Sequence, residues 1–69
     1  MNETGWLIER NIDNLTHWYA VDDNHESKWI RDASKAVRFA RKVDAEAIIR
    51  LKALAYRGAT ATEHSWSEK

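Results

Sequence analysis

The hydrophobic pattern of this 69-residue chain changes its period twice. Residues 5–10 (GWLIER) would place Trp6 and Ile8 on one face and Leu7 and Glu9 on the other, and residues 16–21 (THWYAV) are rich in β-branched and aromatic residues. Both stretches therefore indicate β-strands. Asn and Asp residues, which favour turns, lie between these stretches, so we expect a hairpin. A short strand is expected at residues 28–31 (KWIR). Alternation returns at residues 59–66 (ATATEHSW) and predicts the last strand.

Between residues 33 and 43 the period is that of a helix. At 100° per residue, one sector of the helical wheel is apolar and the opposite sector is basic or polar. The apolar sector contains Ala33, Ala36, Val37, Phe39, Ala40 and Val43. Asp32 is a suitable N-cap for such a helix. We therefore expect a first helix that ends near Lys42.

Asp44 would lie within the apolar stripe if this helix continued. A buried, unpaired carboxylate is costly, whereas an Asp at an N-cap stabilises a helix by about 1 kcal/mol. Val43 and Ile48 occupy the two positions of a hydrophobic staple around such a cap. We therefore interpret Asp44 as the N-cap of a second helix over about residues 45–56, which ends at Gly58.

These elements predict an α+β fold in one domain, residues 1–69, with structure over about residues 5–66. The order is β-β-(short β)-α-α-β. Segregated strands and helices favour a mainly antiparallel sheet with both helices on one face and the other face open. Four Trp residues in so short a chain are expected to contribute much of the core.

Composition narrows the possible classes of protein. The chain has no Cys, no apolar run of membrane-spanning length and no recognisable signal peptide, so we expect a cytoplasmic protein without a membrane segment. The net charge is zero, but the charged residues are mostly acidic within residues 1–27 and mostly basic within residues 28–57. This segregation favours an oriented electrostatic surface.

Few residues are arranged for catalysis or metal binding. His25 lies among Asp22, Asp23 and Glu26, but the loop lacks the glycine and the terminal glutamate of a calcium loop. His17 and His64 lie on different predicted strands and do not form a paired metal-binding motif. No Cys or G-x-S-x-G motif supplies a nucleophile. We therefore expect no enzymatic activity, no metal site and no cofactor.

Basic residues of the predicted first helix form a candidate nucleic-acid-binding surface. These residues and their neighbours are Lys28, Arg31, Lys35, Arg38, Arg41 and Lys42. Such a stripe is typical of surfaces that contact phosphates, but it is more often the solvated face of an amphipathic helix. Nucleic-acid binding is therefore the second hypothesis.

Protein binding is the first hypothesis, because the second helix has two apolar stripes. Ala47, Leu51 and Leu54 continue the core sector, and Ala45, Ile49, Ala53 and Tyr56 lie roughly opposite. A two-layer domain cannot bury both stripes, so Ile49 and Tyr56 are expected to be exposed or to contact a partner, such as a second copy in a homodimer. Alternation in the sheet likewise cannot direct every aromatic residue to the covered face. Trp18 and Tyr19 are therefore candidate anchors of a protein interface.

The order of these motifs resembles that of small, mostly uncharacterised phage and prophage proteins. The shared features are a Trp-bearing hairpin, a D-x-x-x-A-x-x-F segment beginning at Asp32, an A-E-A segment beginning at Ala45, and a closing strand with EHSW. The resemblance spans about residues 5–66. It implies a non-catalytic accessory protein that binds a host protein, for example as an inhibitor of a defence or housekeeping complex. A self-associating structural protein is a further alternative.

Overall fold

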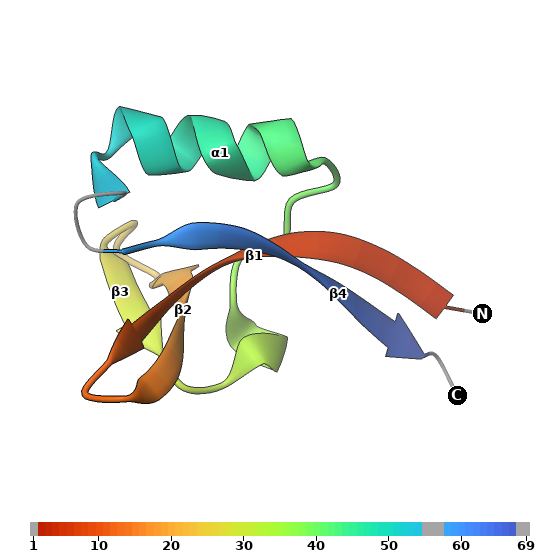
Figure 1. The fold of residues 1–69 in the computed structure, drawn as a ribbon, viewed down its shortest axis with the longest axis horizontal. Helices are drawn as coiled ribbons and strands as arrows, with labels where there is room; N and C mark the ends of the chain where they lie inside the picture. The colour runs from red at the N-terminus through yellow and green to blue at the C-terminus, as the bar shows by residue number, and fades with distance from the viewer. Residues whose placement is uncertain (1, 55–57, 68–69) are drawn as a thin grey trace.

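A four-stranded antiparallel sheet packs against one α-helix in the computed structural model, which describes residues 2–54 and 58–67 (Figure 1). The elements are β1 (Asn2–Ile12), β2 (Leu15–Val21), β3 (Ser27–Ile30), the 3-10 helix η1 (Ala33–Lys35), α1 (Lys42–Leu51) and β4 (Thr60–Ser67). The strand order is β3-β2-β1-β4, so β1 is central and β4 lies at one edge. The predicted α+β class and its four strands are confirmed. The two-helix count is not, because the described residues contain one α-helix and one 3-10 turn.

The β1–β2 hairpin follows the predicted turn chemistry. Asp13 and Asn14 form the two-residue connection, and both have positive φ angles, 52° and 66°. A turn with two left-handed residues matches the right-handed twist of a hairpin, and Asn and Asp tolerate this conformation. The flanking residues Ile12 and Leu15 are paired, and the register continues to Glu9 opposite Trp18.

Residues 36–39 are extended, so the prediction of a first α-helix over residues 33–42 is wrong. The backbone N–H and C=O of Phe39 exchange hydrogen bonds with Trp6 at 2.9 and 2.8 Å, and the Val37 N–H donates to the Tyr19 carbonyl at 3.1 Å. Ala36 is buried, and Val37 and Phe39 are half-buried against the core. Backbone pairing with two strands therefore replaces the helical hydrogen bonds that the local sequence favours.

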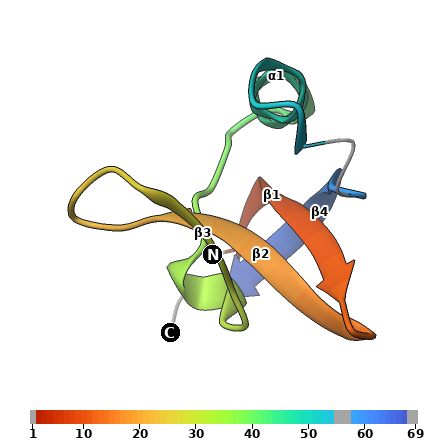
Figure 2. The ribbon, with the colours of Figure 1, turned by 90° about the vertical axis from the view of Figure 1, so that its left-hand side faces the viewer.

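This extended segment carries the chain from one side of the sheet to the other. Figures 1 and 2 show η1 on the side opposite α1, with residues 36–41 rising past the sheet to the start of α1. Asp32 caps η1, accepting hydrogen bonds from the Ser34 hydroxyl at 2.6 Å and the Ser34 N–H at 3.0 Å. The prediction that both helical segments cover one face is therefore wrong.

Asp44 lies in the first turn of α1 and is not its N-cap. The helix begins at Lys42, and its N-cap residue Arg41 makes no side-chain capping bond. The Arg41 guanidinium instead donates two hydrogen bonds of 3.1 Å to the Asp44 carboxylate, which raises the pKa of Arg41. A carboxylate in the first turn also interacts favourably with the helix dipole. A helix thus begins near the predicted start of the second helix, three residues earlier than expected, but no α-helix precedes it within residues 2–41.

Ala53 takes the place predicted for Gly58 at the end of this helix. α1 ends at Leu51 with Lys52 as the C-cap, and the next residue, Ala53, has a φ of 53°. The Ala53 N–H donates to the Arg50 carbonyl at 3.2 Å. Gly58 has a positive φ of 78° but lies beyond the helix end.

The core lies between α1 and the sheet. Its buried residues are Ile8, Tyr19, Ala45, Ile49, Leu54 and Ala59. Leu7 and Ile8 are both fully buried although they project from opposite faces of β1, so each face of the central strand is covered. Trp6 and Trp29 are half-buried at the margin of this core rather than at its centre.

Candidate protein-binding surfaces

The outward face of α1 is apolar. Val43, Ala47 and Leu51 recur every four residues and are all exposed, with 59% of Val43 and 78% of Leu51 accessible to solvent. Residues with this spacing lie along one side of a helix, and apolar residues that are contiguous on a surface, unlike single exposed ones, can mark an interaction site. We call these three residues the outer stripe.

The sequence predicts two apolar stripes on this helix, and the structure exchanges their roles. Ala45 and Ile49, expected outside, are buried against the sheet, whereas Ala47 and Leu51, expected inside, belong to the outer stripe. The prediction extended one helical wheel from residue 33. Because residues 36–39 are extended, the phase of α1 is set independently by the docking of Ala45 and Ile49.

The four predicted partner-binding residues do not form one surface. Tyr19 is buried, and its hydroxyl lies 2.9 Å from the Ser27 hydroxyl, while Ile49 is buried in the same core. Trp18 directly precedes Tyr19 along β2 and therefore projects from the opposite face of the sheet. Tyr56 lies outside the described residues.

The six predicted nucleic-acid-binding residues do not line a helix face, because the helix that would align them is absent. Arg31, Lys35 and Arg38 lie between β3 and α1, whereas Lys28 is on β3 itself. Arg41 is paired with Asp44, and the Lys42 Nζ lies 5.7 Å from the centre of the Trp6 ring. The geometry on which this hypothesis was based is therefore wrong.

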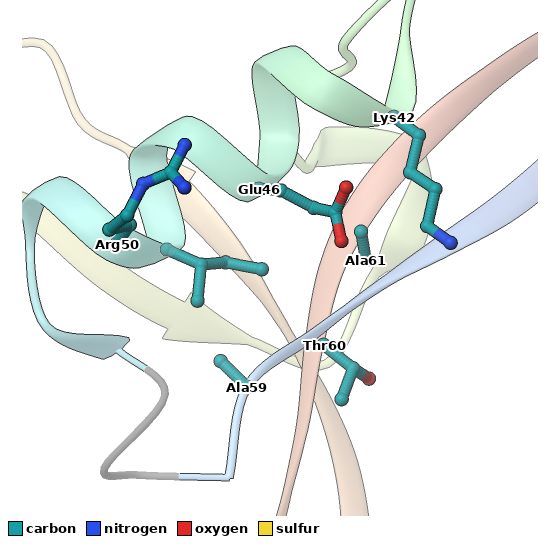
Figure 3. A pocket seen from close by; sticks show the side chains of 7 residues that line it. Lys42, Glu46, Arg50, Ala59, Thr60 and Ala61 are labelled. Carbon is teal, nitrogen blue, oxygen red and sulfur yellow. The ribbon is translucent and has the colours of Figure 1, made fainter.

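A groove runs between α1 and the edge strand β4 (Figure 3). It has a volume of about 520 Å³ and is lined by Lys42, Glu46, Ile49, Arg50, Ala59, Thr60 and Ala61. The charged residues come from successive turns of α1, and the small alanines come from β4 and the residue before it. The groove was not predicted from the sequence, since it depends on which edge of the sheet β4 occupies.

A polar cluster lies on the sheet face opposite α1. The Glu9 carboxylate accepts hydrogen bonds from the Trp18 indole N–H at 3.1 Å and the Thr62 hydroxyl at 3.4 Å, and the His64 Nε2 lies 3.8 Å from the same oxygen. The Thr62 hydroxyl is 3.1 Å from the same His64 nitrogen. Because one ring nitrogen faces both groups, His64 is not arranged to relay a proton between Thr62 and Glu9.

In the acidic loop between β2 and β3, the Asp22 carboxylate stabilises the loop backbone. One Asp22 carboxylate oxygen accepts the backbone N–H groups of Asn24 and Glu26 at 2.9 and 3.0 Å, and His25 has a left-handed φ of 63°. Among residues 2–54 and 58–67, no group of three or more His, Asp or Glu side chains is arranged to hold a metal ion. The His17 Nδ1 lies 2.9 Å from the Leu15 carbonyl oxygen.

Comparisons with known proteins do not assign the chain to a class. No protein-family model matches it, and neither a curated protein nor a solved structure is significantly similar to it. Within the described part of the chain, every helix is too short or too polar to cross a bilayer.

Proposed function

We propose that this protein is a non-catalytic binding module that contacts another protein through the outer stripe of α1. The observation that carries this proposal is the exposure of Leu51, 78% of which is accessible on a helix whose other apolar face already packs against the sheet. Exposed aliphatic surface on a regular, rigid helix is well suited to pack against an apolar groove or a second helix.

The charges around the outer stripe favour a protein partner. Asp44, Glu46 and Arg50 flank it, so both signs of charge surround a narrow apolar strip. A polar rim around an apolar centre is typical of protein interfaces, whereas a phosphate-binding surface would be uniformly basic. The resemblance to phage accessory proteins adds the proposal that the partner is a host protein.

The test is a pair of double variants with matched charges. In Val43→Glu/Leu51→Lys, each new charge suits its end of the helix dipole, so α1 should remain folded while its outward face becomes polar. Leu15→Glu/Val21→Lys makes the same changes at two exposed β2 positions and is the control.

Immobilised protein would be incubated with a bacterial lysate, and captured proteins would be identified by mass spectrometry. We expect a partner that the wild-type and control proteins retain and the α1 variant loses. A photo-crosslinking amino acid at position 51 should form an adduct with that partner. Equal capture by all three proteins would contradict the proposed surface, and a concentration-dependent dimer in sedimentation would identify a second copy as the partner.

A further inference from the structure

The outer edge of β4 has the geometry to pair with another strand. Trp6 exchanges its backbone hydrogen bonds with Phe39, on the side of β1 away from β4. Trp6 and its β4 partner Glu63 therefore form a non-hydrogen-bonded pair, and the Glu63 N–H and C=O point away from β1. Because this direction alternates along a strand, the backbone groups of Ala61 and Ser65 also point outward.

This edge has few of the features that usually prevent strand addition. β4 spans eight residues, whereas β3, at the opposite edge of the sheet, spans four and includes Lys28. Charged side chains, Pro and bulges are the common protections of an edge strand. From Thr60 to Ser65, β4 has Thr, Ala, Glu, His and Ser, with Glu63 as its one carboxylate and no Pro.

The residues that line the groove beside this edge determine which side chains of an added strand would fit there. Ala61 pairs with Ile8 and so projects toward α1, and Figure 3 shows the Glu46 carboxylate lying over Ala61. Glu63 projects from the same face, two residues along. A long side chain opposite Ala61 would thus lie within reach of both carboxylates. It would share this end of the groove with Lys42, whose Nζ lies 5.7 Å from the ring centre of Trp6, the residue paired with Glu63.

Ile49 and Ala59 form the apolar end of the groove. In an antiparallel strand, the residue two positions after the one opposite Ala61 lies toward this end. An aliphatic side chain there would cover Ile49 and Ala59. The Ala59 N–H already donates to the Leu54 carbonyl at 3.3 Å, so backbone pairing would end at Ala61.

We propose that β4 binds an extended peptide segment that adds to the sheet as an antiparallel strand and carries a basic–x–aliphatic sequence. The Lys or Arg lies opposite Ala61 between the carboxylates of Glu46 and Glu63, and the aliphatic residue lies over Ile49 and Ala59. Strand addition of this kind takes its affinity from the backbone and its specificity from alternate side chains. This site does not include the residues of the outer stripe, although Glu46 and Arg50 border both surfaces, and it does not rest on the function proposed above.

The probe is the peptide acetyl-Thr-Thr-Thr-Lys-Thr-Val-Thr-amide, titrated into ¹⁵N-labelled full-length protein and followed by NMR. We expect the amide signals of Ala61, Glu63 and Ser65 to shift. Methylation of the Lys backbone nitrogen removes a hydrogen bond to Ala61 and should weaken binding about tenfold. Methylation of the next Thr nitrogen, which points away from β4, is the matched control and should have little effect.

Charge exchange tests the side-chain part of the proposal. Glu46 is exposed on α1, so Glu46→Lys should leave the fold intact, as circular dichroism would verify. We expect this variant to bind the Lys peptide about fivefold more weakly and a peptide with Glu in place of Lys more tightly than the wild type does. Val43→Glu/Leu51→Lys should bind the Lys peptide as wild type does, which separates this site from the outer stripe.

Three results would overturn the proposal. The first is the absence of shifts at millimolar peptide, and the second is an equal effect of the two N-methylations. The third is a dimer through β4 in the peptide-free protein, detected by sedimentation and by broadening of the same three amides, which would make a second copy the occupant of this edge.

Discussion

Replacing Ala53 with Gly should stabilise the protein, although Gly usually weakens a helical region. Ala53 has a φ of 53°, and the left-handed region costs an L-residue roughly 1–2 kcal/mol. Gly removes this cost but adds roughly 0.5–1 kcal/mol of backbone entropy to be lost on folding. Ala53 is exposed, so little packing is lost. We therefore expect a net stabilisation of about 0.5–1 kcal/mol, or a rise in Tm of roughly 2–8 °C.

Ala47→Gly is the matched control for this prediction. Ala47 is also exposed but lies inside α1, where Gly is expected to cost about 1 kcal/mol. Urea unfolding followed by Trp fluorescence would give the free energy of unfolding of both variants. The two substitutions should change it in opposite directions. If Ala53→Gly instead destabilises the protein as much as Ala47→Gly does, the helix continues through residue 53 and the assigned helix end is wrong.

Two other predictions concern the core and η1. Leu7→Ala should lower the free energy of unfolding by about 2–5 kcal/mol in urea titration, because Leu7 is fully buried; a loss below 1 kcal/mol would mean that its face of β1 is open. The hydrogen bonds from Ser34 lower the pKa of Asp32, so Ser34→Ala should raise that pKa in an NMR titration, and an unchanged value would contradict the bond. Because the folded-state pKa of Asp32 lies below its unfolded value, the stability it contributes is present above the unfolded pKa and is lost as pH falls through the folded pKa.

The strands could be predicted from the sequence because their signals are local. Alternation around Ile8 and Tyr19, and the Asp13–Asn14 turn, specify the hairpin without help from distant residues. The order of the strands could not be predicted, since the place of β4 beside β1 depends on contacts between the two ends of the described chain. The groove between α1 and β4 was therefore missed.

The prediction of a first helix was wrong because the sequence of this segment fits both a helical pattern and a strand pattern. Ala36, Val37 and Phe39 suit the apolar sector of a helix, but Val37 and Phe39 are also spaced as on one face of a strand. Hydrogen bonds to Trp6 and Tyr19 select the extended form. Both predicted surfaces assumed a helix over residues 33–42. Without it, the basic residues do not align on one face, and the buried face of α1 cannot be predicted by continuing the same helical wheel.

The pairing of β1 with β4 constrains how the chain reaches its native state. Asn2 lies opposite Ser67 and Glu9 opposite Thr60, so the central strand acquires one of its neighbours only from the far end of the polypeptide. Contacts of such long sequence separation slow folding, because a large loop must close before they form. During translation the β1–β2 hairpin can form early, but the sheet is complete only after residue 67 has left the ribosome.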